Sequence, residues 1–258
     1  MSTLKHRIWP LILVALASLA CADEAIVSGN GDIISRVRDV PPFSRLVLSG
    51  PIDMTISKLY RNHNCKSIQL SIESNLLQHV RVNSHGDTLI ITLPPLAIPS
   101  RWPTADTYCK NLTYVRAENY GYLRVGINEN TNEFTAEVDN AVITLGGKAN
   151  HFSALVRNSG VLAATLLEAK KSVIEVQAQS FAELKKSDNL NAITEEGGNI
   201  IIFDEKQSPY RMKELSRGVN VIAPNFYHRE YATALFAKID YPRLKPTLIK
   251  AAKDTLKE

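Results

Sequence analysis

The sequence predicts an all-β protein, organised as a right-handed β-solenoid, a β-helix-like stack of short strands, with a short α-helical tail at its C-terminus. Short runs of β-branched and aliphatic residues alternate with polar residues, and Gly, Pro, Asn and Asp separate the runs. Between Leu112 and Phe203 a strand followed by a small polar turn recurs about every 18 to 20 residues, the length of one solenoid coil. Such coils bury their apolar faces only by stacking on one another.

The 258 residues, 45% of them hydrophobic, are enough for one sizeable core. We divide the chain into a signal peptide over residues 1–22, one β domain over 23–224 and a partly helical tail over 225–258.

The first 22 residues have the layout of a secretory signal peptide, in which a basic start precedes an apolar run. The run from Ile8 to Ala20 is short for a membrane span, which needs about 20 apolar residues. Ala20 and Ala22 occupy the positions that signal peptidase reads, so we expect cleavage before Asp23. The alternative is a lipoprotein signal in which Cys21 is the acylated residue.

The folded part opens with the turn-forming segment Ser28–Asp32, and strands with period two follow it. Gly, Pro, His and Asp residues separate several of these strands, and no helical spacing is sustained. The predicted strands are Leu46–Leu48, Ile52–Ile56, Ser67–Ile72, Val80–Val82 and Thr88–Leu93.

The alternation stops over residues 94–111, which contain four prolines. Proline cannot donate a backbone hydrogen bond to a neighbouring strand, so we predict a long loop here rather than a central strand. Trp102 and Tyr108 give this loop apolar surface with which it can dock on the first coil.

The repeated strands are Phe134–Val138, Phe152–Val156, Val173–Val176 and Leu190–Ile193, each followed by a polar turn. Ile200–Phe203 is the most apolar strand, and we expect it to be the last well-packed one. Leu, Ile and Val side chains at alternate positions are expected to point inward. This inward set is Val138, Val142, Leu145, Leu155, Val161, Leu166, Val173, Ile174, Val176, Leu184, Ile193, Ile200 and Ile202.

Removal or acylation of Cys21 leaves an even pair of cysteines, Cys65 and Cys109, in a compartment where disulfides persist. Both lie in turn-like segments, so we expect a Cys65–Cys109 bridge, and the alternative is two unpaired thiols. His63 is close to Cys65, but no second pair of ligands matches them, so we predict no metal site and no cofactor.

The tail differs in composition from the rest of the chain. Seven basic residues against four acidic residues give segment 226–258 a charge of +3. Leu248, Ile249, Ala252 and Leu256 fall on one helical stripe, which predicts a short amphipathic helix. The helix could cover an open end of the stack or lie on a membrane surface. We expect membrane contact only through this tail or a lipidated Cys21.

Net charge argues against a nucleic-acid partner. The whole chain carries +4, and residues 23–258, with 28 bases and 26 acids, carry +2. A nucleic-acid-binding protein would show a much denser basic face.

Five segments in the first half of the chain carry a family resemblance through their order and spacing, namely Ser28–Ile33, Arg38–Pro51, Ile52–Ile56, Ile72–Leu77 and Gly86–Ile90. In these segments the chain resembles the putative auto-transporter adhesin, head GIN domain family. The later repeats extend the likeness to Ile222, although the Ser-Gly-rich turns typical of that family are replaced here. The resemblance implies an exported bacterial protein with a β-solenoid-like fold, no established biochemical activity and no functional residues to carry over.

No sequence motif for a nucleophile elbow, a zinc protease or a phosphate loop is present. The nearest acidic cluster, Asp188 with Glu195 and Glu196, is explained by a solvated turn. We therefore predict a non-catalytic protein of the periplasm, outer membrane or cell surface that presents a face to a protein or glycan partner. The alternative is a carbohydrate-active enzyme, which would need a groove with at least two carboxylates and an Arg or Lys.

Overall fold

The computed structural model describes residues 26–57, 65–195, 197–203 and 219–222. Over these residues the chain is all-β apart from one short 3₁₀ turn, η1 (Leu77–His79), which confirms the predicted class. No helix in the described ranges is long and apolar enough to cross a membrane. The predicted signal peptide over residues 1–22 and the predicted helical tail over 225–258 lie outside the described residues.

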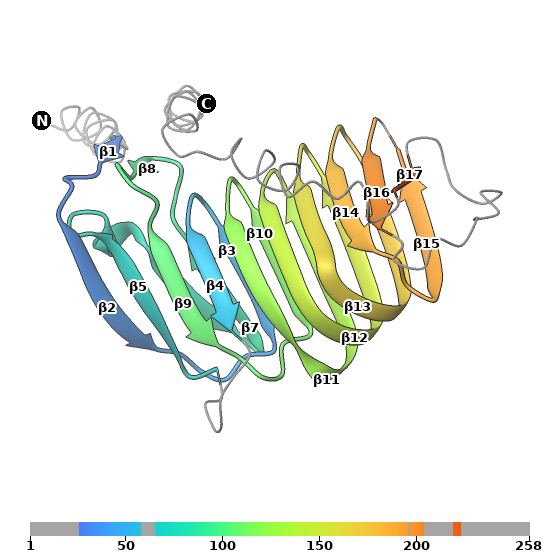
Figure 1. Cartoon of the computed structure of the whole chain (residues 1–258). Helices are drawn as coiled ribbons and strands as arrows, with labels where there is room; N and C mark the ends of the chain where they lie inside the picture. Colours follow the sequence, from blue (N-terminus) through green and yellow to red (C-terminus); the bar gives the residue numbers. More distant parts are fainter. Residues whose placement is uncertain (1–25, 58–64, 196, 204–218, 223–258) are drawn as a thin grey trace, which may run out of the picture.

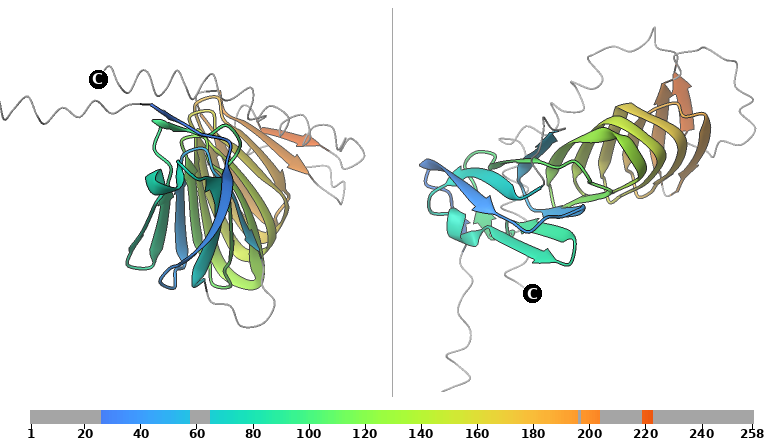
Figure 2. Two further views of the ribbon diagram at one scale, coloured as in Figure 1. Left: turned by 90° about the vertical axis from the view of Figure 1, so that its left-hand side faces the viewer. Right: turned by 90° about the horizontal axis from the view of Figure 1, so that it is seen from below.

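One sheet of fifteen strands curls into a half-barrel, and its concave side holds the core (Figures 1 and 2). Three long parallel strands bend through it and so belong to both of its flanks, namely β11 (Tyr122–Asp139), β12 (Val142–Arg157) and β13 (Val161–Val176).

The first flank contains the amino-terminal halves of β11–β13. It is extended by β4 (Asp53–Ser57), β9 (Thr104–Tyr108), β5 (Ser67–Glu73) and β2 (Ile33–Asp39) at one end and by β14 (Phe181–Lys185), β16 (Asn199–Phe203) and β17 (Val219–Ile222) at the other.

The second flank contains the carboxyl-terminal halves of β11–β13. It is extended by β10 (Tyr114–Glu118), β3 (Arg45–Ser49), β7 (Thr88–Thr92) and β6 (Arg81–His85) at one end and by β15 (Asn189–Thr194) at the other. A separate two-stranded sheet pairs β1 (Val27–Ser28) with β8 (Ala97–Ile98).

The recurrence seen in the sequence sets the register between parallel strands. Phe134 lies beside Phe152, Phe152 beside Ser172, and Ser172 beside Leu190, so each repeat of the sequence pattern advances the chain by one strand. The opening strands do not follow this pattern, since β2 pairs antiparallel with β5, and β6 with β7. The described architecture is therefore a curled half-barrel sheet rather than a uniform stack of coils.

Most of the predicted inward residues are buried, but three of them are exposed. Leu166, Val173 and Ile193 are 72%, 38% and 39% exposed, and Leu155 and Val161 are half-buried. In β15 the prediction was shifted by one residue, since Ala192 points inward in place of Ile193. Side chains of a strand alternate between the two faces, so a shift of one residue reverses every assignment. The repeat pattern in the sequence predicts that Val156, Val176 and Ile193 stack together in successive strands. Instead Thr194 lies beside Val176, and Ile193 lies beside Glu175.

The loop predicted over residues 94–111 is wrong in its central part, where β8 and β9 form. β9 lies between β4 and β5 and pairs with both. The four prolines do not prevent this pairing, because they all precede the strand. Within β9, Ala105 and Thr107 face the core and alternate with exposed residues. The loop was predicted from the proline content of the whole segment, and the short alternating pattern of β9 was overlooked for that reason.

Tight turns connect the second flank back to the first. Asn158 and Ser159 have φ of 55° and 63°, and Ala178 and Gln179 have 47° and 59°. Two successive positive φ values are typical of type I′ turns, and each turn is closed by a backbone hydrogen bond, from Gly160 to Arg157 and from Ser180 to Gln177. Gly160 follows its turn where an added Cβ would lie 2.9 Å from two carbonyl oxygens, so this position requires glycine.

Glu73, at the end of β5, holds the opening segment against the sheet. Its carboxylate is buried and accepts hydrogen bonds from the backbone N–H of Gly31 (2.6 Å) and of Ser100 (2.8 Å) and from the Ser100 hydroxyl (2.5 Å). A side chain at Gly29 would occupy the space of this carboxylate. Glu73 thus joins the turn before β2 to the segment before β9.

Glu183 on β14 is a second buried carboxylate, only 2% exposed. Burial raises its pKa above the ordinary value of 4.5, because desolvation disfavours the charged form. We therefore expect Glu183→Gln to stabilise the protein at pH 7 by about 1 kcal/mol, which raises Tm by about 2–4 °C.

The advantage of Glu183→Gln should shrink as pH falls through the raised pKa and vanish below 4.5, where the carboxyl group is protonated in both folded and unfolded chains. Melting curves of both proteins from pH 7 to pH 4 measure this. A difference that stays constant over that range would contradict the assignment.

Candidate binding face

The outer surface of the second flank carries a ladder of charged and aromatic side chains, here called the binding face. It is formed by Arg45, Tyr114, Arg116, Glu118 and Glu137. Strand register places Arg45 beside Tyr114, and Arg116 beside Glu137. The strand segment Tyr114–Glu118 alternates outward polar with inward apolar residues, so its outward side chains come from one strand face.

Electrostatic contacts fix these side chains. The Arg45 guanidinium lies 4.0 Å from the centre of the Tyr114 ring, a cation–π geometry. Arg116 forms an ion pair with Glu118 (2.6 Å) and lies 3.9 Å from Glu137. Burial alone would lower the pKa of Arg116, but Glu118, Tyr114 and Glu137 raise it. Burial, and then Glu137, raises the pKa of Tyr114, so Tyr114 keeps its proton at neutral pH.

Further along the face the charged contacts give way to exposed apolar side chains. Arg157 on β12 forms an ion pair with Asp139 on β11 (2.9 Å). Val173 and Ile193, two of the exposed residues that were predicted to point inward, then present 38% and 39% of their surface. The face therefore combines cations, carboxylates, an aromatic ring and small apolar contacts.

A groove of about 580 Å³ opens at the end of this face, where β11 bends. Its walls come from Arg45, from the segment Lys110–Tyr114, and from β11. The β11 side chains in the lining are Asn128, Thr131, Asn132, Glu133 and Thr135. Glu133 is the single carboxylate among these lining residues.

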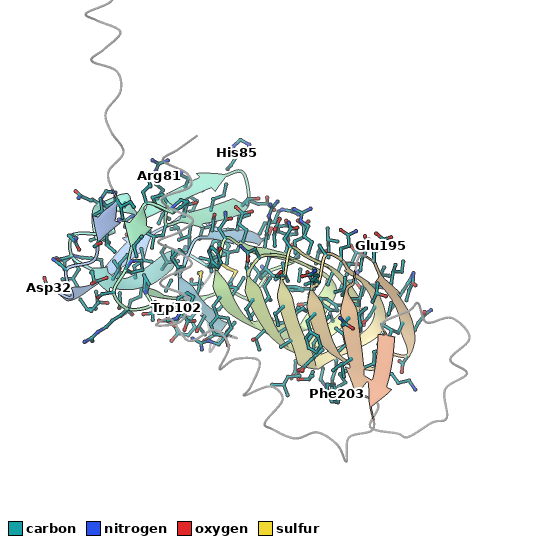
Figure 3. The ribbon with its side chains drawn as sticks, turned by 90° about the horizontal axis from the view of Figure 1, so that it is seen from above. Asp32, Arg81, His85, Trp102, Glu195 and Phe203 are labelled. Carbon is teal, nitrogen blue, oxygen red and sulfur yellow. A yellow bond between two sulfur atoms is a disulfide. The ribbon has the colours of Figure 1, made fainter. Side chains whose placement is uncertain are left out.

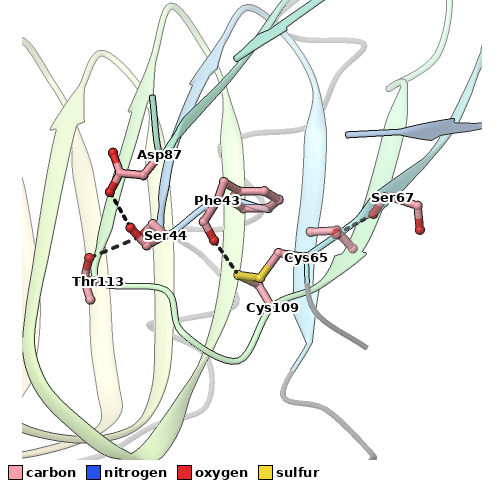
Figure 4. Close-up of a disulfide and its surroundings, with 8 residues drawn as sticks. Phe43, Ser44, Cys65, Ser67, Asp87, Cys109 and Thr113 are labelled. Carbon is pink, nitrogen blue, oxygen red and sulfur yellow. Dashed lines mark hydrogen bonds between the residues drawn. A yellow bond between two sulfur atoms is a disulfide. The ribbon is translucent and has the colours of Figure 1, made fainter. Parts of the chain in front are cut away.

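The predicted disulfide between Cys65 and Cys109 is present, with Cα atoms 4.6 Å apart (Figure 4). Cys109 directly precedes Lys110, so the bridge anchors the segment that forms one wall of the groove. The Cys109 sulfur lies 3.5 Å from the carbonyl oxygen of Phe43. Further along, the N–H and hydroxyl of Thr113 donate to the carbonyl oxygen of Ser44 at 2.8 and 3.2 Å. The chain between Cys109 and Thr113 is thus fixed at both ends.

The Ser44 hydroxyl donates in turn to the Asp87 carboxylate at 2.6 Å. This hydrogen bond lowers the pKa of Asp87, and the nearby charge of Arg45 adds to the effect. Segments from three distant parts of the sequence therefore meet beside the groove.

The other predicted site residues have no described surroundings. Ala20, Cys21, Ala22 and Asp23 all precede residue 26, where the description begins. Cys65 forms the disulfide with Cys109, so it has no free thiolate with which to bind a metal ion. Within the described ranges no group of three His, Cys, Asp or Glu residues is arranged to hold a metal ion.

The acidic cluster named as the nearest catalytic candidate is only partly described, because Glu196 lies outside the described residues. Asp188 is exposed and Glu195 accepts a hydrogen bond from Gln177 (3.3 Å). Side chains around Glu195 lie at one end of the molecule, and those around Arg81 on β6 lie toward the other (Figure 3).

A family model described as "Putative auto-transporter adhesin, head GIN domain" matches residues 42–205, more than half of the chain. The chain belongs to the head GIN domain family. No curated protein sequence matches it.

A solved structure shares the fold of this head GIN domain at low sequence identity, and two others are similar over the same share of the chain with lower TM-scores. A putative adhesin from Bacteroides fragilis is 12% identical, with a TM-score of 0.54 over 76% of this chain and 97% of its own. A putative adhesin from Parabacteroides merdae is 16% identical over 76% and 95%, with a TM-score of 0.42. A putative lipid binding protein from Parabacteroides distasonis is 12% identical over 76% and 96%, with a TM-score of 0.40.

The binding face and the groove of this head GIN domain were missed in the sequence. A signal was present in Tyr114–Glu118, where an aromatic residue and two charged residues alternate with Val and Ala. The partner strand could not be identified, because β4 to β9 separate β3 from β10 in the sequence and only the folded register brings Arg45 to Tyr114.

Proposed function

We propose that this protein is a non-catalytic component of the cell envelope or cell surface that binds a protein or glycan partner through the binding face. In this proposal residues 1–22 direct export and are removed before Asp23, or Cys21 is lipidated. The strands then act as a rigid, solenoid-like support for the face. Family membership supports export and an adhesin-like role, since the family is described in those terms.

One observation carries the proposal. The outward side chains of the second flank are held in a fixed order by parallel register, and cation–π and ion-pair contacts orient them before any partner arrives. Preorganised side chains lose little conformational entropy on binding. Arg and Tyr are also the residue types enriched where binding energy concentrates at interfaces.

The carbohydrate-active enzyme is less well supported. Glycoside hydrolysis commonly uses two carboxylic acids that flank the scissile bond, and Glu133 is the single acid in the groove lining. The carboxylates on the face are occupied in ion pairs with Arg116 and Arg157. The arrangement of these carboxylates therefore favours binding over turnover.

The test uses protein recovered from the envelope fraction of the producing cell, with its N-terminus defined by intact mass. We expect it to bind envelope material or host surfaces and to release no sugar from glycans. Ser153→Arg, at an exposed position between Thr135 and Val173 in the register of the second flank, should lower binding at least tenfold, because a long charged side chain next to the face blocks close contact.

Ser67→Arg is the matched control, since Ser67 is an exposed serine on β5 in the first flank, and this variant should bind as the wild type does. Equal loss of binding in both variants would place the partner elsewhere. Sugar release that is abolished by Glu133→Gln would reject the binding proposal in favour of the carbohydrate-active enzyme. A protein that binds none of the surfaces tested would also contradict the binding proposal.

A further inference from the structure

The groove beside the face has the chemistry of a sugar site rather than of an apolar ligand pocket. Seven of its eleven lining side chains are neutral hydrogen-bonding groups, three of them Asn, three Thr and one Tyr. Pockets for drug-like ligands are lined mainly by apolar side chains. In this groove the aliphatic lining residue is Leu112, which is 5% exposed and packs in the core.

The amide groups are oriented by the protein so that donors remain available. The backbone N–H of Glu129 donates to Asn128 Oδ1 at 3.0 Å, which fixes that oxygen as an acceptor and leaves the Nδ2 group for a ligand. Asn150 Nδ2 donates to Asn132 Oδ1 at 3.2 Å. Thr113 donates its hydroxyl hydrogen to Ser44, so its oxygen keeps an accepting lone pair. Alternating donors and acceptors of this kind match sugar hydroxyls.

The charges of the groove favour an acidic sugar. Arg116, Arg124, Lys148, Arg157 and Lys185 form ion pairs within 4.0 Å. Arg45 and Lys110 in the groove form no ion pair within that distance among the described residues, as is also true of several bases elsewhere on the surface, and the charge of Arg45 acts on nearby Asp87. Arg45 is instead stacked on Tyr114. Stacking leaves the in-plane N–H groups of a guanidinium free to bind a carboxylate at two points. Two bases and one acid give the lining a charge of +1.

We propose that this groove binds an acidic oligosaccharide, with Arg45 binding the carboxylate of a uronic-acid residue and Asn128 and Asn132 donating to neighbouring hydroxyls. Glu133 accepts from a hydroxyl of the same segment. The inference rests on the proposed function and specifies one ligand class and one site for it.

The test measures binding of the full exported protein to uronic-acid oligosaccharides from alginate, pectin and hyaluronan, each beside a neutral oligosaccharide of equal length. We expect at least one acidic member to bind about tenfold more tightly than its neutral counterpart, since a charge-assisted bidentate bond is lost in the latter. Arg45→Gln should remove that preference. Asn128→Ala should weaken acidic and neutral members alike.

Arg81→Gln is the matched control, because it removes the same charge from an exposed position on β6 that does not line the groove. Equal effects of Arg45→Gln and Arg81→Gln would reduce the binding to general charge attraction and overturn the site. Lack of preference for every acidic member would overturn the ligand class. Surface binding that survives in Arg45→Gln but is lost in Ser153→Arg would leave the proposed function standing and reject this inference alone.

Discussion

Val176→Asp is expected to unfold the domain. Val176 is completely buried at the end of β13 and lies between Val156 and Thr194 in the register of the second flank. A carboxylate placed there would lose its hydration without gaining a cationic partner, at a cost of several kcal/mol. Native domains are stable by only about 5–15 kcal/mol. Far-UV circular dichroism and a denaturant titration should show loss of the cooperative transition.

Val173→Asp provides the control on the same strand. Val173 faces outward and is 38% exposed, so the same new charge stays in contact with water and should change stability by less than about 1 kcal/mol. The pattern of apolar residues alone would place both valines in the core. Unfolding of both variants would show that the described register of β13 is wrong.

Removal of the disulfide is expected to be the second large effect. The bridge joins cysteines 44 positions apart, and a closed loop of that length restricts the unfolded chain by about 4 kcal/mol in the chain-entropy model. The Cys65→Ser, Cys109→Ser double variant should unfold at a clearly lower urea concentration than the wild type. It should also bind acidic oligosaccharides more weakly, because Cys109 holds the segment that forms one wall of the groove.

Treatment of the wild type with a reductant should reproduce the lower urea midpoint, and the double variant should not respond to reductant. A wild type whose midpoint is the same with and without reductant would contradict the prediction. Free-thiol labelling of the oxidised, unfolded protein supplies an independent measurement, and it should detect neither Cys65 nor Cys109.

The sequence was informative about the class, the repeat and the cysteine pair, because each depends on local chemistry. Alternating β-branched residues specify strands wherever they occur, and the spacing between paired strands is visible as a recurrence of similar segments. An even cysteine count in an exported chain favours a bridge, and that bridge is present.

Register and long-range pairing were harder to predict. In β11 and β12 the core positions are odd-numbered before the bend and even-numbered after it. In β13 they change parity twice, since Leu167 is buried between even-numbered core positions on both flanks. Leu166 and Val173 therefore could not be assigned from periodicity. β9 pairs antiparallel with β5, although β6, β7 and β8 lie between them in the sequence. No local sequence motif predicts this pairing. The groove depends on both strand register and long-range pairing, because Arg45 and the residues at the bend of β11 form its walls together.

Parallel register along β11, β12 and β13 has a consequence for how this protein can vary in length. Neighbouring strands lie about 4.8 Å apart, so gain or loss of one whole repeat would change the reach of the molecule by one such step. Phe134 lies beside Phe152, and Val138 lies beside Val156, one repeat further along the chain. Loss of one whole repeat would therefore leave the remaining side chains beside equivalent neighbours. A shorter deletion would shift every later side chain away from its equivalent neighbour. Insertions and deletions among homologues should therefore consist of whole repeats, and each one should lengthen or shorten the sheet by one strand.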